Sequence, residues 1–350
     1  MAQINKPNLH FNTKLYTGNG SSGHSITGVG FQPDWVWIKN REQSYSHFLT
    51  DAVRGVTKEI YSDSNGAEYT RSNGLTAFGA DGFTVGDNNG HNQNGNNLAS
   101  WNWKAGGGQG SSNTDGSINT TYTSVNTTAG FSISTWTGTG ANGTIGHGLG
   151  AKPEMIIVKN YSASQNWCVY HSGLSGTEGH KTLYLDLNQA EADQTGLWND
   201  TAATSSVFSV GTNTNTNGSS ASMIAYAFAE KKGYSKFGSY TGNGNADGTF
   251  VYTGFKPAFL MVKKTDSAEN WYMKDNKRDP RNEMNQSVLY ANGNAVENTG
   301  GSWLKGDAVS NGFKIRISDS SSNGSNSPYI YMAFAENPIV GSNNIPATAR

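Results

Sequence analysis

The chain has 350 residues, of which 15% are charged, and 25 Lys+Arg are nearly balanced by 26 Asp+Glu. A net charge of −1 lacks the electrostatic footprint of a protein that binds nucleic acid or an anionic membrane surface. The 44 Gly and the 11% of aromatic residues argue against a disordered chain and favour an all-β protein with many turns.

The start of the chain and its single cysteine indicate where it folds. Residues 1–7 lack the apolar core of a signal peptide, and no apolar run approaches the roughly 20 residues of a membrane span. Cys168 is the one cysteine, so no intrachain disulfide can form. We therefore expect a protein that folds in a reducing cytoplasm and is not inserted into a membrane.

In chain order, the first predicted elements are an aromatic-Thr-Gly-x-Gly turn and then a strand in which proline precedes an apolar run that ends in lysine. This pair of elements occurs three times, with turns at 16–20, 136–140 and 240–244 and strands at 31–40, 151–160 and 255–264. Tyr16 and Pro33 recur in the second copy as Trp136 and Pro153, and both are displaced by the same number of residues. They recur in the third copy as Tyr240 and Pro257, again with a displacement that is the same for both. Agreement of both offsets indicates an internal repeat.

The later strands of each copy also repeat. The post-proline runs carry apolar residues at both odd and even positions, which predicts central strands covered on both faces. We expect six of their side chains to be buried, namely Val36, Ile38, Ile156, Val158, Leu260 and Val262. Each copy closes with a strand that alternates aromatic and small residues, at 100–103, 225–230 and 331–336, as a half-buried strand does. Short helical turns are predicted at 51–58 and 188–193.

The repeat period is close to the size of one β-sandwich domain. The sequence therefore predicts an all-β protein of three tandem antiparallel β-sandwich modules, jelly-roll-like, with few short helices. The expected modules are residues 1–108, 121–232 and 233–340, with a flexible Gly/Ser-rich linker at 109–120 and a C-terminal tail at 341–350.

The first copy resembles a repeat domain of structural proteins of marine tailed phages, such as those that infect cyanobacteria. The resemblance is carried by Gly30–Arg41, Asp51–Lys58, Asp81–Gly86 and Trp101–Gly108, and the C-terminal segments Ala333–Pro338 and Ile345–Arg350 are also similar. It implies a virion structural protein, as a capsid decoration, a knob or a tail-fibre component. The expected partners are other virion proteins, and a homo-oligomer, a trimer by analogy with phage appendages, is expected. The chain would be made in the host cytoplasm and reach the virion without a signal peptide.

Other functions remain as alternatives. The first is an adhesin that recognises host surface glycans, and the second is a glycan-degrading enzyme. An enzyme of that kind needs two carboxylates in one cleft, whereas Asp63, Asp186 and Glu154 are dispersed in the sequence. We predict no catalytic residue and no cofactor, so the protein is expected to act by contact.

The candidate ligand contacts are aromatic. Trp167 and Trp271 occupy matching places in two copies, and Tyr45 is taken as the variant in the first copy; core packing or sugar stacking explains such rings. His171 follows an aromatic strand and is a further candidate contact. The Asn/Gly-rich segment 87–97 offers oxygen donors for calcium, but it lacks a final bidentate glutamate, and turn formation explains it better. No metal ligand is therefore predicted.

Overall fold

The computed structural model describes residues 4–280, 282–284, 286–300, 304–337, 339–340 and 346–347. The protein is mostly β, with 40% strand and 6% helix, and its sheets are antiparallel. The predicted all-β class with few short helices is confirmed. Most of the predicted tail at 341–350 lies outside the described residues.

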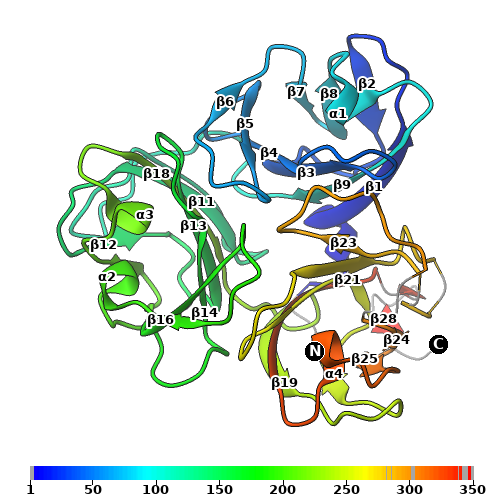
Figure 1. Cartoon of the computed structure of the whole chain (residues 1–350). Coiled ribbons are helices and arrows are strands. Elements are labelled where there is room, and N and C mark those ends of the chain that lie inside the picture. The colour runs from blue at the N-terminus through cyan, green and yellow to red at the C-terminus, as the bar shows by residue number, and fades with distance from the viewer. Residues whose placement is uncertain are drawn as a thin grey trace.

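Three lobes surround a common centre (Figure 1). Lobe 1 comprises the 3-10 helix η1 (Pro7–Leu9), the helix α1 (Asn89–Asn92) and the strands β1 (Phe11–Thr17), β2 (His24–Thr27), β3 (Trp35–Asn40), β4 (Phe48–Asp51), β5 (Lys58–Tyr61), β6 (Tyr69–Thr70), β7 (Leu75–Gly79), β8 (Gly82–Val85) and β9 (Asn97–Trp103). Lobe 2 comprises the helices α2 (Thr195–Trp198) and α3 (Thr214–Asn217) and the strands β10 (Tyr122–Asn126), β11 (Phe131–Thr137), β12 (Gly143–Gly146), β13 (Met155–Asn160), β14 (Cys168–His171), β15 (Lys181–Tyr184), β16 (Ala192–Asp193), β17 (Val207–Val210) and β18 (Ser222–Phe228). Lobe 3 comprises the helix α4 (Ser320–Asn323) and the strands β19 (Ser235–Thr241), β20 (Phe250–Tyr252), β21 (Pro257–Lys264), β22 (Tyr272–Asp275), β23 (Leu289–Tyr290), β24 (Gly306–Val309), β25 (Gly312–Ile315) and β26 (Pro328–Ala335). A hairpin of β27 (Ile339–Val340) and β28 (Pro346–Ala347) follows.

The large sheets of the three lobes have the same strand order. Lobe 1 has the order β1-β9-β3-β4-β5-β6, and lobe 3 has β19-β26-β21-β22-β23. Lobe 2 has β11-β18-β13-β14-β15-β16, with β10 added at the edge beside β11. In each lobe the closing strand therefore lies between the first strand and the post-proline strand, which is central as predicted.

Each post-proline strand is buried on both faces. In β3, Val36 and Ile38 pack toward the small sheet of their own lobe, together with residues such as Phe83, while Trp35 and Trp37 face the centre of the molecule. The same alternation holds in β13 and β21. All six predicted core side chains are confirmed as buried, none more than 1% exposed: Val36, Ile38, Ile156, Val158, Leu260 and Val262.

One hydrophobic core at the centre is shared by all three lobes. The Trp35 ring of lobe 1 stacks on Tyr226 of lobe 2, with 4.3 Å between ring centroids. The Phe11 ring of lobe 1 stacks on Phe334 of lobe 3 at 4.8 Å. Phe228 of lobe 2 also meets Phe334, at 6.2 Å. Each large sheet is thus the middle layer between a small sheet on its outside and the other two lobes on its inside.

This arrangement corrects the expectation for the closing strands. They were predicted to be half-buried, yet β9, β18 and β26 are buried on both faces along nearly their whole length. The small residues of β18, such as Ala225, face the small sheet, and the rings of Tyr226 and Phe228 face the shared core.

The lobes are joined by contacts that follow one another around the ring. Trp167 Nε1 of lobe 2 donates to the Tyr61 carbonyl of lobe 1 at 2.9 Å. Trp271 Nε1 of lobe 3 donates to the Tyr184 carbonyl of lobe 2, also at 2.9 Å. In lobe 1 the corresponding side chain is His47, which lies against the backbone of Tyr290 in lobe 3. The three acceptor tyrosines pair with the first residues of β4, β14 and β22 in the same register.

A second set of contacts also closes the ring, with donors and acceptors in the opposite order. The backbone N–H of Glu68 donates to the Tyr161 carbonyl, that of Glu191 to Thr265, and that of Glu297 to Arg41, each at 2.8 Å. These bonds link lobe 1 to lobe 2, lobe 2 to lobe 3 and lobe 3 to lobe 1. The lobes therefore form a closed ring within a single chain.

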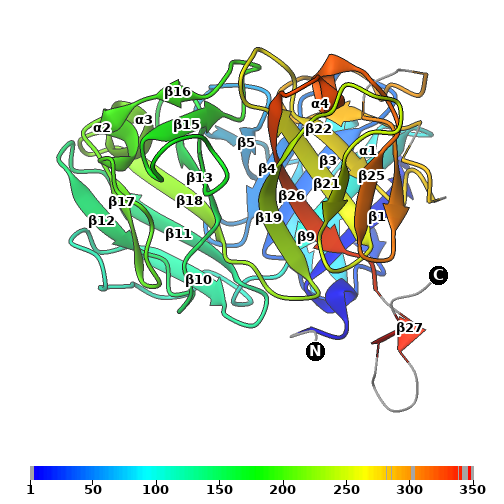
Figure 2. The ribbon, with the colours of Figure 1, turned by 90° about the horizontal axis from the view of Figure 1, so that it is seen from below.

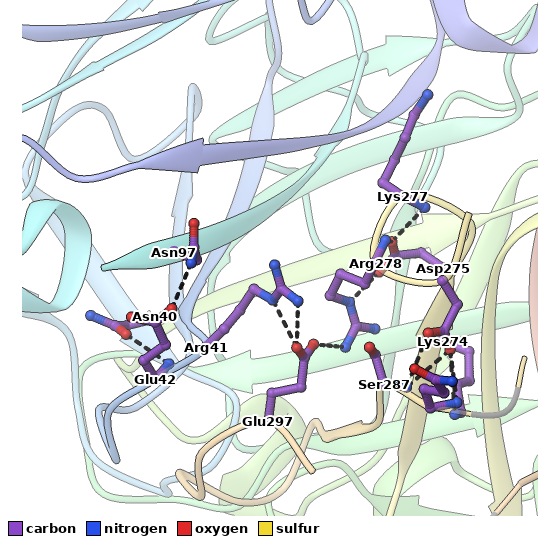
Figure 3. A network of polar contacts seen from close by, with 12 residues as sticks. Asn40, Arg41, Glu42, Asn97, Lys274, Asp275, Lys277, Arg278, Ser287 and Glu297 are labelled. Atoms are coloured by element: carbon purple, nitrogen blue, oxygen red, sulfur yellow. Dashed lines mark hydrogen bonds and ion pairs between the residues drawn. The ribbon is translucent and has the colours of Figure 1, made fainter. Parts of the chain in front are cut away.

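The junction between lobes 3 and 1 contains a buried ionic network (Figure 3). Glu297 accepts from Arg41 Nη2 at 2.5 Å and from Arg278 Nη1 at 2.8 Å. Arg278 Nε also bonds Asp275 Oδ2 at 2.5 Å, and the side chains of Arg278 and Asp275 are both 0% exposed. Trp101 Nε1 of lobe 1 donates to the same Asp275 oxygen at 3.1 Å, so the network crosses the junction.

The aromatic-Thr-Gly-x-Gly turns are held by a buried asparagine. In lobe 1, Asn92 Oδ1 accepts the Asn19 N–H at 2.9 Å, and its Nδ2 donates to the Ser21 carbonyl at 2.9 Å. A Cβ on Gly18 would lie 2.2 Å from the carbonyl oxygen of Gln93, and Gly20 has a φ of +68°. Both glycines are therefore required by the turn. Asn217 and Asn323 hold the corresponding turns of the other lobes, where they accept the backbone N–H groups of Thr139 and Asn243.

The segment 109–120 is bonded to lobe 2 rather than free. Ser111 forms a β-bridge with Thr123, and a Cβ on Gly110 would lie 2.0 Å from the Thr123 carbonyl oxygen. Glycine here permits close backbone approach, whereas a flexible linker was expected.

The short helices do not occur where the sequence predicted them. Residues 52–57 form turns between β4 and β5, where Asp51 Oδ1 accepts the backbone N–H groups of Val53 and Arg54 at 3.1 and 2.9 Å. Residues 188–193 contain the short strand β16 instead of a helix. The helices α1, α3 and α4 follow Asn or Asp caps in polar runs. In Figure 2 the helices α1 to α4 lie at one end of the molecule and β27 at the other.

Candidate functional site

A pocket of about 400 Å³ lies in lobe 1 beside α1. Its lining combines two aromatic rings, one arginine, one carboxylate and three amides, contributed by Tyr45, Phe48, Arg71, Asn73, Asp87, Asn88, Asn89 and Gly90. The volume is within the range of small-molecule sites. We call this the Tyr45 pocket.

A buried network supports one wall of the Tyr45 pocket. Glu59 has a fully buried side chain, and its Oε2 accepts from Arg71 Nε at 2.8 Å. Tyr61 OH accepts from Arg71 Nη2 at 3.1 Å and donates to Glu59 Oε2 at 3.3 Å. Arg71 also lies over the ring of Tyr69, 4.8 Å from its centroid. The Glu59 and Tyr61 partners raise the pKa of Arg71, so its guanidinium is charged and held in place.

The second arm of the network is His91 in α1. Its Nε2 lies 3.0 Å from Glu59 Oε1, and both side chains are 0% exposed. Its Nδ1 lies 3.0 Å from Asn88 Oδ1, and its ring packs on Phe48 with 4.2 Å between centroids. The local sequence favours this geometry, because Asn88 caps α1 by accepting the Gly90 N–H at 2.9 Å.

The rim of the pocket is exposed and polar. Asn73 Nδ2 donates to Asp87 Oδ1 at 2.7 Å, and both residues are exposed, as is Asn89. The pocket therefore offers donors and acceptors fixed around an aromatic surface, with one cation and one anion.

The four predicted ligand-contact residues lie in different environments, and of the four only Tyr45 lines the pocket beside α1. Tyr45 is half-buried and lines the pocket. Trp167 and Trp271 are at most 1% exposed at the lobe junctions, so neither ring has a free face for a sugar in this structure. Tyr45 does not correspond to these tryptophans, because the strand register pairs Phe48 with Tyr61 and thereby puts His47 in their place. The assigned equivalence of Tyr45 is thus corrected.

His171 lies at the junction of lobes 2 and 3 and is 3% exposed. Its Nδ1 accepts the Gly173 N–H at 2.9 Å, so Nε2 carries the proton and donates to the Tyr331 carbonyl at 3.2 Å. Burial lowers the pKa of His171 to about 4. The side chain therefore holds two lobes together as a neutral imidazole and is not open to a ligand.

The low pKa of His171 predicts a pH-dependent stability. Between pH 6.5 and about 4 the unfolded chain protonates this residue and the folded chain does not, so acid favours unfolding. The contribution is complete above pH 6.5 and falls by up to about 3 kcal/mol as the pH approaches 4. The difference in unfolding free energy between the wild type and a His171→Gln variant should shrink by that amount, measured by urea denaturation from pH 7.5 to 4.

Comparison with the variant is needed because other groups titrate in the same range with the opposite sign. Burial raises the pKa of Asp186 to about 6, for example. A constant difference between wild type and variant across this pH range would contradict the assignment to His171.

Three side chains that were weighed as possible catalytic groups have structural roles, namely Cys168, Asp63 and Asp186. Cys168 is buried, and burial raises its thiol pKa well above the ordinary value. Asp63 Oδ1 and Asp186 Oδ1 each accept a backbone N–H at 2.9 Å, from His47 and Trp167 respectively. In the described parts of the chain, no group of three or more His, Cys, Asp or Glu side chains could hold a metal ion. No helix among the described residues is long and apolar enough to cross a membrane.

Sequence reasoning missed Glu59, Arg71 and His91. They are distant in the sequence and match no motif. The available signal was a comparison of the repeats, since Glu59 lies two residues before Tyr61, where the other lobes have Thr182 and Val288.

The fold and the pocket define an all-β protein of three sandwich-like lobes that carries a polar, aromatic-lined pocket on one of them. The chain belongs to the family described as Domain of unknown function (DUF7483), whose model matches residues 6–338. That match spans all three lobes. No curated protein matches the chain, and no solved structure does.

Proposed function

We propose that this protein is a structural component of a tailed-phage particle that works by contact rather than by catalysis. The observation that carries the proposal is the closed ring of lobes with one shared core, which makes a stiff body from a single chain. The resemblance of Gly30–Arg41 and the segments after it to phage structural proteins supplies the location.

We also propose that the three lobes arose as repeats of one module. We regard the lobes as three tandem copies of one β-sandwich module, because the strand order, the buried post-proline strands and the junction contacts recur in the same order. Superposing the lobes of an experimental structure tests it. Pro33, Pro153 and Pro257 should coincide, and core strands that cannot be overlaid with these prolines in register would contradict the tandem repeat.

The contacts of the carboxylates support binding over turnover. Glu59, the buried acid beside the Tyr45 pocket, accepts hydrogen bonds from Arg71 and Tyr61 through Oε2, so this oxygen is already used inside the pocket wall. Asp63 and Asp186 bind backbone N–H groups. The proposed partners are other virion proteins and further copies of this chain, and the site of assembly is the virion.

Localisation in the particle tests the virion role. Mass spectrometry of purified particles should detect the chain at a stoichiometric level, and electron microscopy should place its three-lobed outline at a defined position on the capsid or tail. Particles assembled without the chain should lack that density. Absence of the chain from purified particles would exclude the role.

A second candidate function is glycan binding, and the Tyr45 pocket favours it. Aromatic rings beside amide and charged side chains are suited to sugars, which have apolar C–H faces and many hydroxyl groups. On a particle, many copies of one weak site would bind a cell surface by avidity. Cleavage of a glycan that is abolished by Asp87→Asn would instead support the enzyme alternative.

A further inference from the structure

Features found in all three lobes serve the architecture, whereas the network behind the Tyr45 pocket occurs, among the residues that the structure describes, in lobe 1 alone. The position of Glu59 is Thr182 in lobe 2 and Val288 in lobe 3, each two residues before the tyrosine of the junction. His91 precedes the asparagine that holds the turn, and the residues at its position are Thr216 and Ser322.

The other lobes show that the fold does not need charges here. Thr182 Oγ1 donates to the Val169 carbonyl at 3.2 Å, and Thr216 Oγ1 donates to the Leu197 carbonyl at 3.0 Å. Burying a carboxylate and an imidazole in their place is unfavourable unless every partner is present, and such pairs often contribute no net stability. A costly network that only one lobe contains indicates a role other than folding.

That role is to fix Arg71 in the pocket wall. Its Nε and Nη2 are held by Glu59 and Tyr61, and its guanidinium is stacked on Tyr69. Among the described residues, its Nη1 makes no hydrogen bond, which leaves a positioned donor for a ligand. His91 fixes the opposite side through Asn88.

We infer that the Tyr45 pocket binds one uncharged, hydroxyl-rich sugar unit. Arg71 and the amides of Asn73, Asn88 and Asn89 supply hydrogen-bond donors, while Asp87 and the amide oxygens supply acceptors. The charge of Arg71 is already paired with Glu59, and Asp87 adds a carboxylate at the rim, so an anionic ligand is disfavoured. Tyr45 offers a ring on which the C–H face of a sugar packs.

This inference rests on the proposed glycan binding and not on the virion role. The full-length protein would be titrated by saturation-transfer NMR with neutral methyl hexosides, with N-acetylglucosamine, and with glucuronic acid as the anionic comparison. A neutral sugar should bind and glucuronic acid should bind less well. Tyr45→Ala should weaken binding about tenfold, which corresponds to the loss of one aromatic contact.

Asn73→Ala and Asp87→Asn are second variants that leave the fold intact, because both side chains are exposed; each should also weaken binding. Gln165→Ala is the matched control, since Gln165 lies two residues before Trp167 as Tyr45 lies two before His47, and it should bind like the wild type. If Tyr45→Ala and Asp87→Asn both bind the glycan like the wild type, the Tyr45 pocket is not the binding site, although the protein still binds glycans. Preference for glucuronic acid would overturn the uncharged class, and no binding to any sugar would overturn both while leaving the virion role to its own test.

Discussion

Replacing Trp35 with alanine is expected to lower the free energy of unfolding by about 3–5 kcal/mol, the usual loss for a large ring removed from a core. Trp35 is 1% exposed, and its ring contacts Trp103 at 4.5 Å in its own lobe and Tyr226 at 4.3 Å in lobe 2. The cavity would therefore open between lobes, where no single lobe can collapse to fill it.

The same shared core implies that the wild type unfolds in one cooperative transition. Urea denaturation followed by circular dichroism and by tryptophan fluorescence should give coincident curves, shifted together in the variant. Tyr252→Ala is the control, because Tyr252 is 64% exposed in β20 and its loss should change stability little. Separate transitions of which only one moves with Trp35 would mean that the lobes fold independently, contrary to the shared core.

The strands could be predicted because their patterns are local. A run such as Trp35–Ile38, apolar at every position, has to be covered on both faces, and the structure covers it with a small sheet and the central core. The burial of the closing strands was predicted wrongly. Their alternation of ring and small residue is compatible with one exposed face, and a single repeat holds no information that two other lobes cover that face.

The junction residues show a different limit. Matching ring to ring paired Tyr45 with Trp167 and Trp271, yet His47 stands at the same distance from Pro33 as Trp167 from Pro153. The distance from the proline identifies the equivalent residues better than the residue type does. The strand register preserves the position, whereas the side chain at that position is histidine in lobe 1 and tryptophan in lobes 2 and 3. His47 still lies against the next lobe, as both tryptophans do.

The pocket could be predicted only in part. Tyr45 was a candidate from its aromatic character, but Glu59, Arg71 and His91 come from three separate segments that the β5–β6 pairing and the β8–α1 connection bring together. Tertiary proximity of this kind has no local pattern. A position-by-position comparison of the repeats locates the network, because the ionisable Glu59 stands where the other two copies have the neutral Thr182 and Val288.

Removing the Asp275 carboxylate is expected to destabilise the protein by about 3–5 kcal/mol, because it leaves a buried guanidinium without its nearest partner. Asp275 binds Arg278 Nε, the backbone N–H of Arg278 at 2.9 Å and Trp101 Nε1 at 3.1 Å. An Asp275→Ala variant would leave all three donors unpaired at the junction of lobes 3 and 1. Urea denaturation of Asp275→Ala at pH 7.5 measures the loss.

The surface pair of Arg316 and Asp307 provides the control, with side chains 47% and 29% exposed. Asp307→Ala should cost about 0–1 kcal/mol, as exposed ion pairs do. Lobe 2 has His171 and Leu174 where lobe 3 has Asp275 and Arg278, so this position can be filled without an ion pair. A double variant, Asp275→His with Arg278→Leu, should therefore be more stable than Asp275→Ala, because it removes the unpaired charge along with its partner. If the double variant is the less stable of the two, Arg278 stabilises the junction through Glu297 even without Asp275, and the burial of an unpaired charge is not the reason for the loss.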